Sequence, residues 1–160
     1  MSPALTASAV FGALCAPVGI VVGAYIGLTA TGDGYQLFFL PAGLGAFVTA
    51  LGFWWLMVER GARHTLMRGA LAGASAGVVA HYVCWYLLLL GNFARAAMAG
   101  ETLGGNAGAI DPLNALWGAA AFTFWSLIIF GWLTLPAGAL LGAGYAKWRR
   151  RRLGSPTTRG

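Results

Sequence analysis

Residues 69–93, GALAGASAGVVAHYVCWYLLLLGNF, contain no Asp, Glu, Lys or Arg, and this stretch decides the fold class. Arg68 lies directly before it and Arg95 follows shortly after it. A helix needs about 20 predominantly apolar residues to cross the roughly 30 Å hydrocarbon core of a bilayer. The stretch is long enough to do so and has basic residues only beyond its ends. It therefore predicts a transmembrane helix.

Three further apolar stretches lie along the chain, with expected spans of 4–30, 37–58 and 115–146. The chain has 160 residues, of which 59% are hydrophobic and 9% charged, whereas soluble domains are about 25% charged. We predict an all-α polytopic membrane protein with four transmembrane helices in a compact bundle. This domain is expected over 1–148, and a basic cytoplasmic tail without regular structure over 149–160.

The basic residues are distributed unequally between the connectors. Nine of the ten Lys and Arg residues lie in the connector 59–68 or after residue 146, and the other two connectors hold only Arg95. Cytoplasmic loops carry an excess of Lys and Arg, so we expect both termini in the cytoplasm. Short connectors and a high glycine and alanine content favour a bacterial inner (plasma) membrane. The excess of Lys and Arg in these segments also accounts for the net charge of +6. We therefore do not expect a nucleic-acid partner.

Cationic side chains at the expected cytoplasmic ends are candidates for contact with lipid or with a partner. Each Lys or Arg close to an anionic leaflet gains about 1 kcal/mol of attraction. Contact with anionic lipids is the interpretation we favour, and docking of a cytoplasmic partner is the alternative. This cytoplasmic cluster consists of Arg60, Arg63, His64, Arg68, Arg149, Arg150, Arg151 and Arg152.

Two of the spans carry glycines at every fourth position. Glycine at this spacing removes the side chains from one helix face, so that two backbones can approach closely. We expect these faces to pack within the bundle. The alternative is a seam with a second copy or with another membrane subunit. The residues are Gly19, Gly23 and Gly27 in the first span, and Gly69, Gly73 and Gly77 in the third.

His81 is the one titratable group of note expected at mid-membrane depth. The favoured interpretation is a neutral imidazole that is hydrogen-bonded inside the bundle, to Thr49, Thr123 or Ser126. A second interpretation is an axial ligand of haem or chlorophyll, because neutral imidazole binds iron and magnesium. The other histidine, His64, lies at the inner face, so a bis-histidine haem would need a partner subunit. A third is a polar contact on a substrate path.

Two features predict local structure at the outer end and in the last span. Asp111 and Pro112 are typical of a helix start, with Asp111 as the N-cap and Pro112 at the first helical position. Pro136 predicts a kink, because proline removes one backbone hydrogen bond and clashes with the preceding turn. The connector 94–114 is long and rich in glycine, which favours irregular structure or a role in contacts.

The residue types speak against catalysis and against ion coupling. Ion-coupled carriers place ionisable groups at membrane depth, and no Asp, Glu, Lys or Arg falls clearly inside a span. No CxxC motif is present, so neither a redox nor a metal site is expected from Cys15 and Cys84. We expect a non-catalytic accessory or structural subunit of a larger membrane complex.

Two alternatives remain open at this point. One is an oligomeric channel or carrier for a neutral or apolar small solute, and the other is a haem-binding or pigment-binding subunit that uses His81. In the first case a stripe of polar groups would line the path. Its members would be Thr6, Ser8, Thr49, Ser75, His81, Thr123, Ser126 and Thr134.

Overall fold

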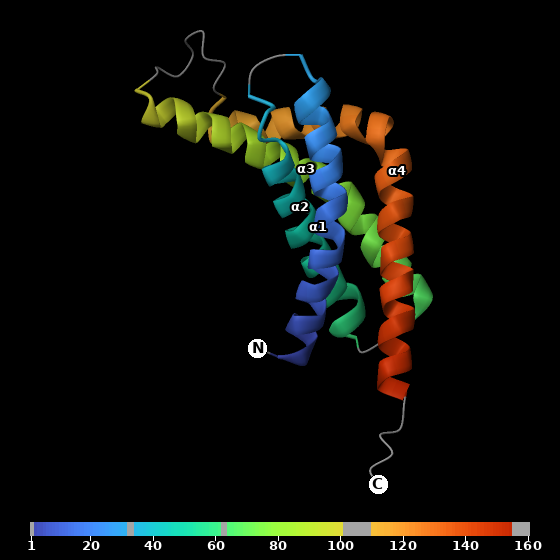
Figure 1. The fold of residues 1–160 in the computed structure, drawn as a ribbon. Coiled ribbons are helices and arrows are strands. Elements are labelled where there is room, and N and C mark those ends of the chain that lie inside the picture. The colour runs from blue at the N-terminus through green and yellow to red at the C-terminus, as the bar shows by residue number, and fades with distance from the viewer. Residues whose placement is uncertain (1, 32–33, 62–63, 101–109, 155–160) are drawn as a thin grey trace.

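The computed structural model describes residues 2–31, 34–61, 64–100 and 110–154, and every regular element in these ranges is helical. The helices are α1 (Pro3–Thr29), α2 (Phe39–Trp54), α3 (Leu66–Met98) and α4 (Pro112–Gly154), and a short π-helix, η1 (Trp55–Glu59), continues α2 (Figure 1). With η1 added to α2, all four are long and apolar enough to cross a membrane. The prediction of an all-α chain with four such helices is confirmed.

Side chains and glycine define several helix ends. Ser2 accepts a hydrogen bond from the backbone N–H of Leu5 at 3.3 Å, and Thr65 accepts one from Arg68 N–H at 3.3 Å. Asp111 Oδ1 accepts from the backbone of residues 113 and 114, and α4 begins at Pro112, so the predicted start of this helix is confirmed. Gly100, with φ at +71°, follows α3 in the left-handed conformation that favours glycine.

The π-helix η1 positions one acidic side chain. In a π-helix the backbone bond runs from residue i+5 to residue i, and Arg60 N–H donates to the Trp55 carbonyl at 2.8 Å. Residues five apart then lie above one another. Trp54 Nε1 consequently reaches Glu59 Oε1 at 3.1 Å, and the carboxylate turns toward the interior.

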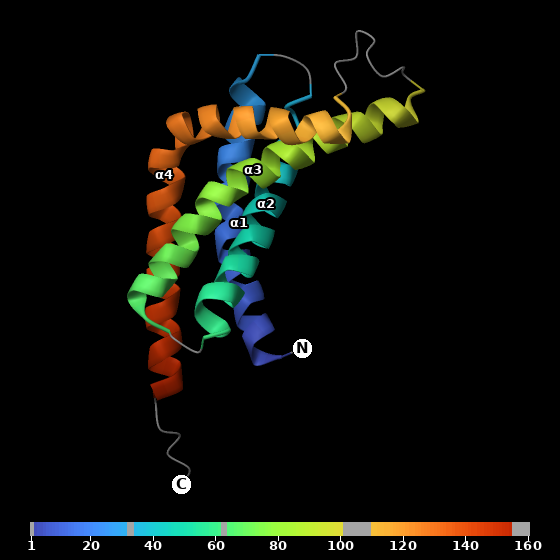
Figure 2. The ribbon, with the colours of Figure 1, turned by 180° about the vertical axis from the view of Figure 1, so that it is seen from behind.

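The helices pack largely in chain order. α1 packs on α2, α2 on α3, and α3 on α4, whereas α1 and α4 make little contact. Figures 1 and 2 show that the first half of α4 runs along α3, turned from the direction of its own second half, and that the outer end of α3 extends beyond the other helices. The packing therefore differs from the compact bundle expected, because α4 is bent and packs almost entirely on α3.

The length of α4 exceeds what a single crossing requires. Its 43 residues correspond to about 64 Å of helix, against a hydrocarbon core of about 30 Å. We call residues 112–130 the α4 arm. At the other end the helix continues to Gly154, so the expectation of irregular structure from Arg149 onward is wrong for 149–154. Arginine is a good helix former and is favourable near a helix C-terminus.

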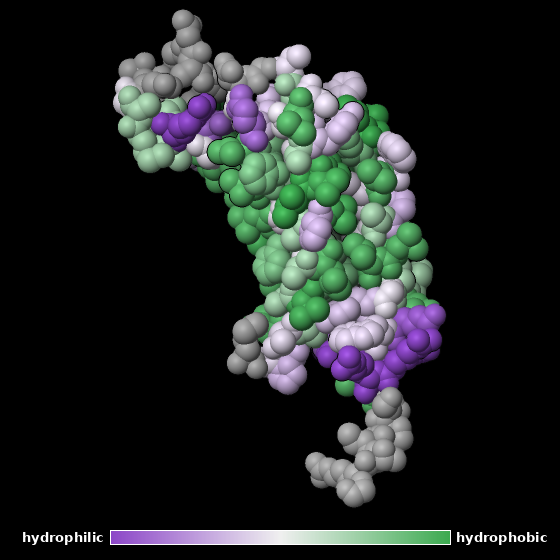
Figure 3. Space-filling model, viewed as in Figure 1, coloured by the Kyte–Doolittle hydropathy of each residue, from purple (hydrophilic) through white to green (hydrophobic). Residues whose placement is uncertain are grey.

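The two ends of the molecule differ in charge. The start of α1, η1 and the end of α4 lie at one end of the molecule, which we call the end with the termini, and the end of α1, the start of α2 and the end of α3 lie at the opposite end (Figure 1). On the face drawn in Figure 3, apolar surface fills the middle and hydrophilic surface lies toward both ends. Arg63, which the sequence analysis placed in the cytoplasmic cluster, and Arg159, which it counted among the basic residues, lie outside the described residues.

Candidate functional site

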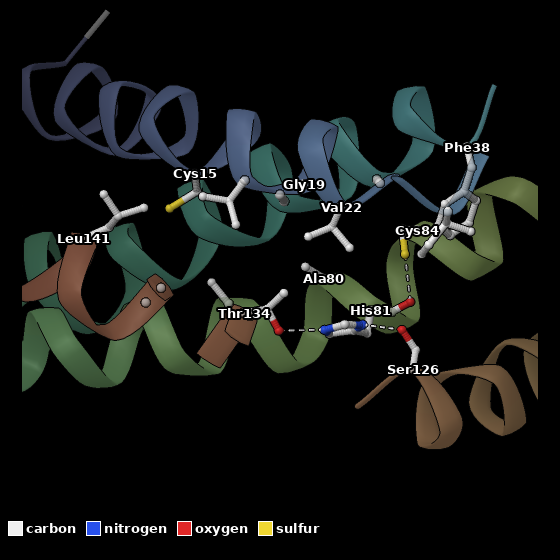
Figure 4. A pocket seen from close by; sticks show the side chains of 18 residues that line it. Cys15, Gly19, Val22, Phe38, Ala80, His81, Cys84, Ser126, Thr134 and Leu141 are labelled. Carbon is white, nitrogen blue, oxygen red and sulfur yellow. Dashed lines mark hydrogen bonds between the residues drawn. The ribbon is translucent and has the colours of Figure 1, made fainter. Parts of the chain in front are cut away.

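A groove in the middle of the molecule lies between the α1–α2 pair and the α3–α4 pair (Figure 4). Its volume is about 70 Å³, well above the roughly 10–15 Å³ that a cavity needs to hold one water molecule. Aliphatic residues, glycines and two cysteines form most of the wall. The strongly polar side chains among the lining residues are His81, Ser126 and Thr134. They gather at one place, where α3 meets the bend of α4.

Both ring nitrogens of the buried His81 are hydrogen-bonded. Nε2 lies 2.9 Å from Thr134 Oγ1, and Nδ1 lies 2.6 Å from Ser126 Oγ. Thr134 donates its own hydroxyl proton to the Phe130 carbonyl at 3.1 Å, so it accepts from His81 Nε2–H. The other nitrogen of a neutral ring is an acceptor, and Ser126 O–H donates to it. With this assignment, both nitrogens of an uncharged imidazole and both hydroxyl protons have a hydrogen-bond partner.

The bend of α4 brings the two hydroxyls to the same ring. A straight helix would separate Ser126 and Thr134 by about 12 Å along its axis. One imidazole ring and hydrogen bonds of 2.6 Å and 2.9 Å cannot bridge that separation with such short side chains. The helix therefore bends between these residues, as Figures 1 and 2 show. Pro136 follows directly and weakens the preceding turn, which agrees with the predicted kink.

Of the three hydroxyls predicted as partners of His81, the structure brings only Ser126 to it. Thr49 donates instead to Gly45 O at 2.7 Å, and Thr123 donates to Ala119 O at 2.6 Å. Thr134 was not predicted as a partner. Its proximity to the kink at Pro136 was the available signal, because a bend changes which faces of α4 can meet α3.

The rest of the predicted polar stripe does not gather at the groove. Ser8 donates to Ala4 O at 2.9 Å and Thr6 donates to Ser2 O at 3.2 Å, so both hydroxyls bond to the backbone of their own helix. Cys84 lies beside His81 and its Sγ donates to the His81 carbonyl at 3.1 Å. Trp85, one helical turn after His81 on α3, stacks on Phe122 of α4 at a ring-centroid distance of 4.9 Å.

A cluster of charged side chains around Glu59 lies at the end with the termini. The Glu59 side chain is only 6% exposed and its carboxylate accepts from Arg149 Nη2 at 3.1 Å and 3.2 Å. His64 Nε2 lies 3.3 Å from Glu59 Oε1. Beside this ion pair, Tyr145 donates to Ala7 O at 3.0 Å. The cluster therefore fastens the second half of α4 to η1 and α1.

The predicted cytoplasmic cluster divides into two groups. Arg149 and His64 face Glu59, and Arg68 Nη1 donates to the Met57 carbonyl at 3.0 Å. The guanidinium of Arg60 lies over Trp55 at 5.9 Å, and that of Arg152 over Trp148 at 4.8 Å. Such Arg–Trp pairs are typical of a membrane–water boundary.

Four glycines carry the contact between α3 and α4. A Cβ added at Gly142 would lie 2.7 Å from Gly69 C and 3.3 Å from Gly73 N, with the Gly69 carbonyl oxygen nearer still. Gly73 and Gly138 face each other in the same way. In α1, a Cβ at Gly23 would lie 2.7 Å from Phe39 Cα. The predicted glycine faces are thus in contact with helices of the same chain.

The chemistry available at these sites is limited. Within the described ranges no three His, Cys, Asp or Glu residues come close enough to hold a metal ion. Cys15 and Cys84 are free thiols. The hydroxyls bound to His81 occupy both nitrogens, so an axial ligand to haem or chlorophyll would have to lose one of these bonds.

Comparisons with protein-family models, curated proteins and solved structures found no match for the chain.

Proposed function

We propose that this protein is a non-catalytic, multi-pass inner-membrane protein that acts as an accessory or structural subunit of a larger membrane complex. The main observation that supports this proposal is the α4 arm. It packs on the outer half of α3 and is turned from the direction of the second half of α4 (Figure 2). A helix that needed only to cross the bilayer would not require this extension.

The arm exposes large aromatic side chains. Trp117 is 79% exposed, Phe124 63% and Trp125 62%, and Trp132 at the bend is 73% exposed. Large aromatic residues supply much of the binding energy at protein interfaces because each buries a large area at little conformational cost. Lipid covers the apolar side chains of any spanning helix. In the proposed complex, the exposed rings of the arm also contact a neighbouring subunit.

The distribution of charge supports an orientation with both termini in the cytoplasm. Seven of the eight described Lys and Arg residues lie at the end with the termini, and only Arg95 lies at the other. An excess of Lys and Arg marks the cytoplasmic side. Accessibility labelling of cysteines introduced next to Arg60 and Arg95 tests this orientation, and labelling of the position beside Arg60 from outside the cell would contradict it.

Photo-crosslinking from the arm tests the proposed role in an assembly. A photoactivatable residue at 117 or 125 should crosslink to one defined membrane protein in native membranes. The matched control is position 21, where Val21 is 68% exposed on α1 and should crosslink mainly to lipid. If positions 117 and 125 give only lipid adducts, the arm does not serve as a subunit interface and the proposal fails.

The groove supports a second candidate, an oligomeric carrier or channel for a neutral or apolar small solute. With Ser126 and Thr134 donating their protons as assigned above, their oxygens keep only acceptor capacity toward the groove. The fitting solute is therefore apolar or a hydrogen-bond donor. Flux of such a solute into proteoliposomes that is lost in His81→Ala would favour this function. Its absence with the wild-type protein would exclude it.

A further inference from the structure

A second groove lies at the end opposite the termini, between the start of α2 and the outer half of α3. Its volume is about 250 Å³, close to the lower end of the range for small-molecule pockets. We call it the outer groove. Its walls combine three polar side chains with apolar ones and consist of Gln36, Leu37, Leu40, Pro41, Leu87, Leu88, Asn92 and Arg95, together with two glycines.

The polar and apolar parts of the outer groove are separated along the helix axes. On α3, Leu88, Asn92 and Arg95 lie four and then three positions apart, so they share one helix face, and Arg95 lies about 10 Å further toward the helix end than Leu88. Across the groove, Gln36 lies in the connector and Leu40 lies inside α2. Both walls thus place polar groups at the outer end and apolar groups toward the middle.

Three side chains that line the outer groove carry hydrogen-bond donors that are not bonded to an acceptor among the described residues. Among the described residues, no ion pair or hydrogen bond involves the side chain of Arg95 or that of Asn92. Gln36 Oε1 accepts from Gly34 N–H at 3.1 Å, which leaves its NH₂ group as a donor. One guanidinium and two amide NH₂ groups at one place suit the oxygens of an anion, and arginine binds phosphate in a bidentate manner.

We propose that the outer groove is a binding site for one anionic phospholipid from the leaflet at that end of the molecule. The phosphate contacts Arg95, with Asn92 and Gln36 as further donors, and the first part of an acyl chain lies along Leu40 and Leu88. The charge of Arg95 and the change from polar to apolar walls at headgroup depth select an amphiphile over a soluble anion. This site lies away from the basic cytoplasmic cluster, and the inference does not depend on the proposed subunit function.

Native mass spectrometry of the purified full-length protein in mild detergent tests the proposal. The probes are phosphatidylglycerol and phosphatidylcholine with the same acyl chains. The wild-type protein should retain one phosphatidylglycerol at least tenfold more tightly than phosphatidylcholine. Arg95→Gln should lose most of this preference and Arg95→Lys part of it, because an ammonium keeps the charge but loses the bidentate geometry. The matched control, Lys147→Gln, removes one positive charge at the other end, outside the predicted cytoplasmic cluster, and should keep the preference.

Two results would overturn the proposal. Equal loss of phosphatidylglycerol in Arg95→Gln and Lys147→Gln would mean that net charge and not the outer groove holds the lipid. Tighter retention of oleate or inorganic phosphate than of phosphatidylglycerol would mean that the assigned occupant is wrong. A phosphatidylglycerol with a photoactivatable acyl chain provides a check on the unmodified protein. Its adducts should map to 37–41 or 87–95, and adducts confined to the basic end would contradict the site.

Discussion

The contact between α3 and α4 makes the stability of the fold sensitive to a single methyl group. Gly142→Ala would place a Cβ 2.7 Å from Gly69 C and 3.3 Å from Gly73 N. The obstacle is backbone, which cannot rotate away as a side chain can. Overpacking of this kind costs about 1–3 kcal/mol, and we expect the upper half of that range, about 2–3 kcal/mol, because the two helices must separate.

Gly144→Ala is the matched control for this substitution. It lies two positions away on the same helix, and no atom lies within 4 Å of its added Cβ. Alanine is favoured over glycine in a helix by about 1 kcal/mol, and this gain applies to both variants and cancels when they are compared. The free energies of unfolding of the two variants should therefore differ by about 2–3 kcal/mol, a factor of roughly 30–150 in the unfolding equilibrium.

Titration with sodium dodecyl sulfate in mixed micelles, followed by tryptophan fluorescence, measures both free energies of unfolding. The expected order of stability is Gly144→Ala at or above the wild-type protein, and Gly142→Ala well below it. If the two alanine variants unfold within about 0.5 kcal/mol of each other, the close approach of α3 and α4 is not the determinant of stability that the structure implies.

Three further predictions concern the hydrogen-bonded clusters. Ser126→Ala removes the donor to His81 Nδ1 and should destabilise the protein by about 1 kcal/mol, and in the wild-type protein ¹⁵N NMR should show a protonated Nε2 and an unprotonated Nδ1. Glu59→Gln weakens a charge-assisted bond to Arg149 and should cost about 2 kcal/mol in the same titration. Hydrogen bonds from Asn114, foremost from its backbone N–H, hold the pKa of Asp111 below its usual range. The capping of α4 should therefore be complete above about pH 4 and be lost as the pH falls through this lowered pKa. The protection of the backbone amides of residues 113–116 from hydrogen exchange, relative to their intrinsic rates, measures this loss.

Each of these predictions has a control or a contradicting result. Thr123→Ala removes a hydroxyl that bonds only to its own helix, so it should cost less than Ser126→Ala. Arg152→Gln keeps the ion pair of Glu59 and should leave stability nearly unchanged. Protection at the start of α4, taken as the intrinsic exchange rate relative to the observed rate at each pH, that falls with rising pH would have the wrong sign for a carboxylate cap.

The four long apolar helices, the helix start at Asp111 and the kink near Pro136 could be predicted from the sequence because each depends on local residue types. Length and hydropathy are sufficient for a span, and proline acts on the turn that precedes it. The partners of His81 are a different case. Ser126 lies 45 positions away along the chain. Which hydroxyls of α4 reach the ring depends on the direction and size of the bend in α4. The sequence predicts where this bend lies but neither its direction nor its size.

The ion pair of Glu59 could not be predicted for a similar reason. Both Glu59 and Arg149 lie in segments whose composition is typical of solvated membrane flanks, and nothing local separates a paired arginine from a lipid-facing one. The single π turn of η1 directs the carboxylate inward, and helix α4 must extend past residue 148 for the guanidinium to arrive. Such long-range pairing depends on how whole helices are placed relative to one another.

The central claim, that the protein is a subunit of a larger membrane complex, is tested most directly by gentle purification from native membranes. The measurement is native mass of the intact particle, mass identification of co-eluting chains and a visible absorption spectrum. The proposal predicts a particle of fixed stoichiometry that contains at least one different membrane protein and that dissociates when Trp117 and Trp125 are replaced by alanine. A colourless particle that contains only this chain and keeps its mass in that variant would contradict it.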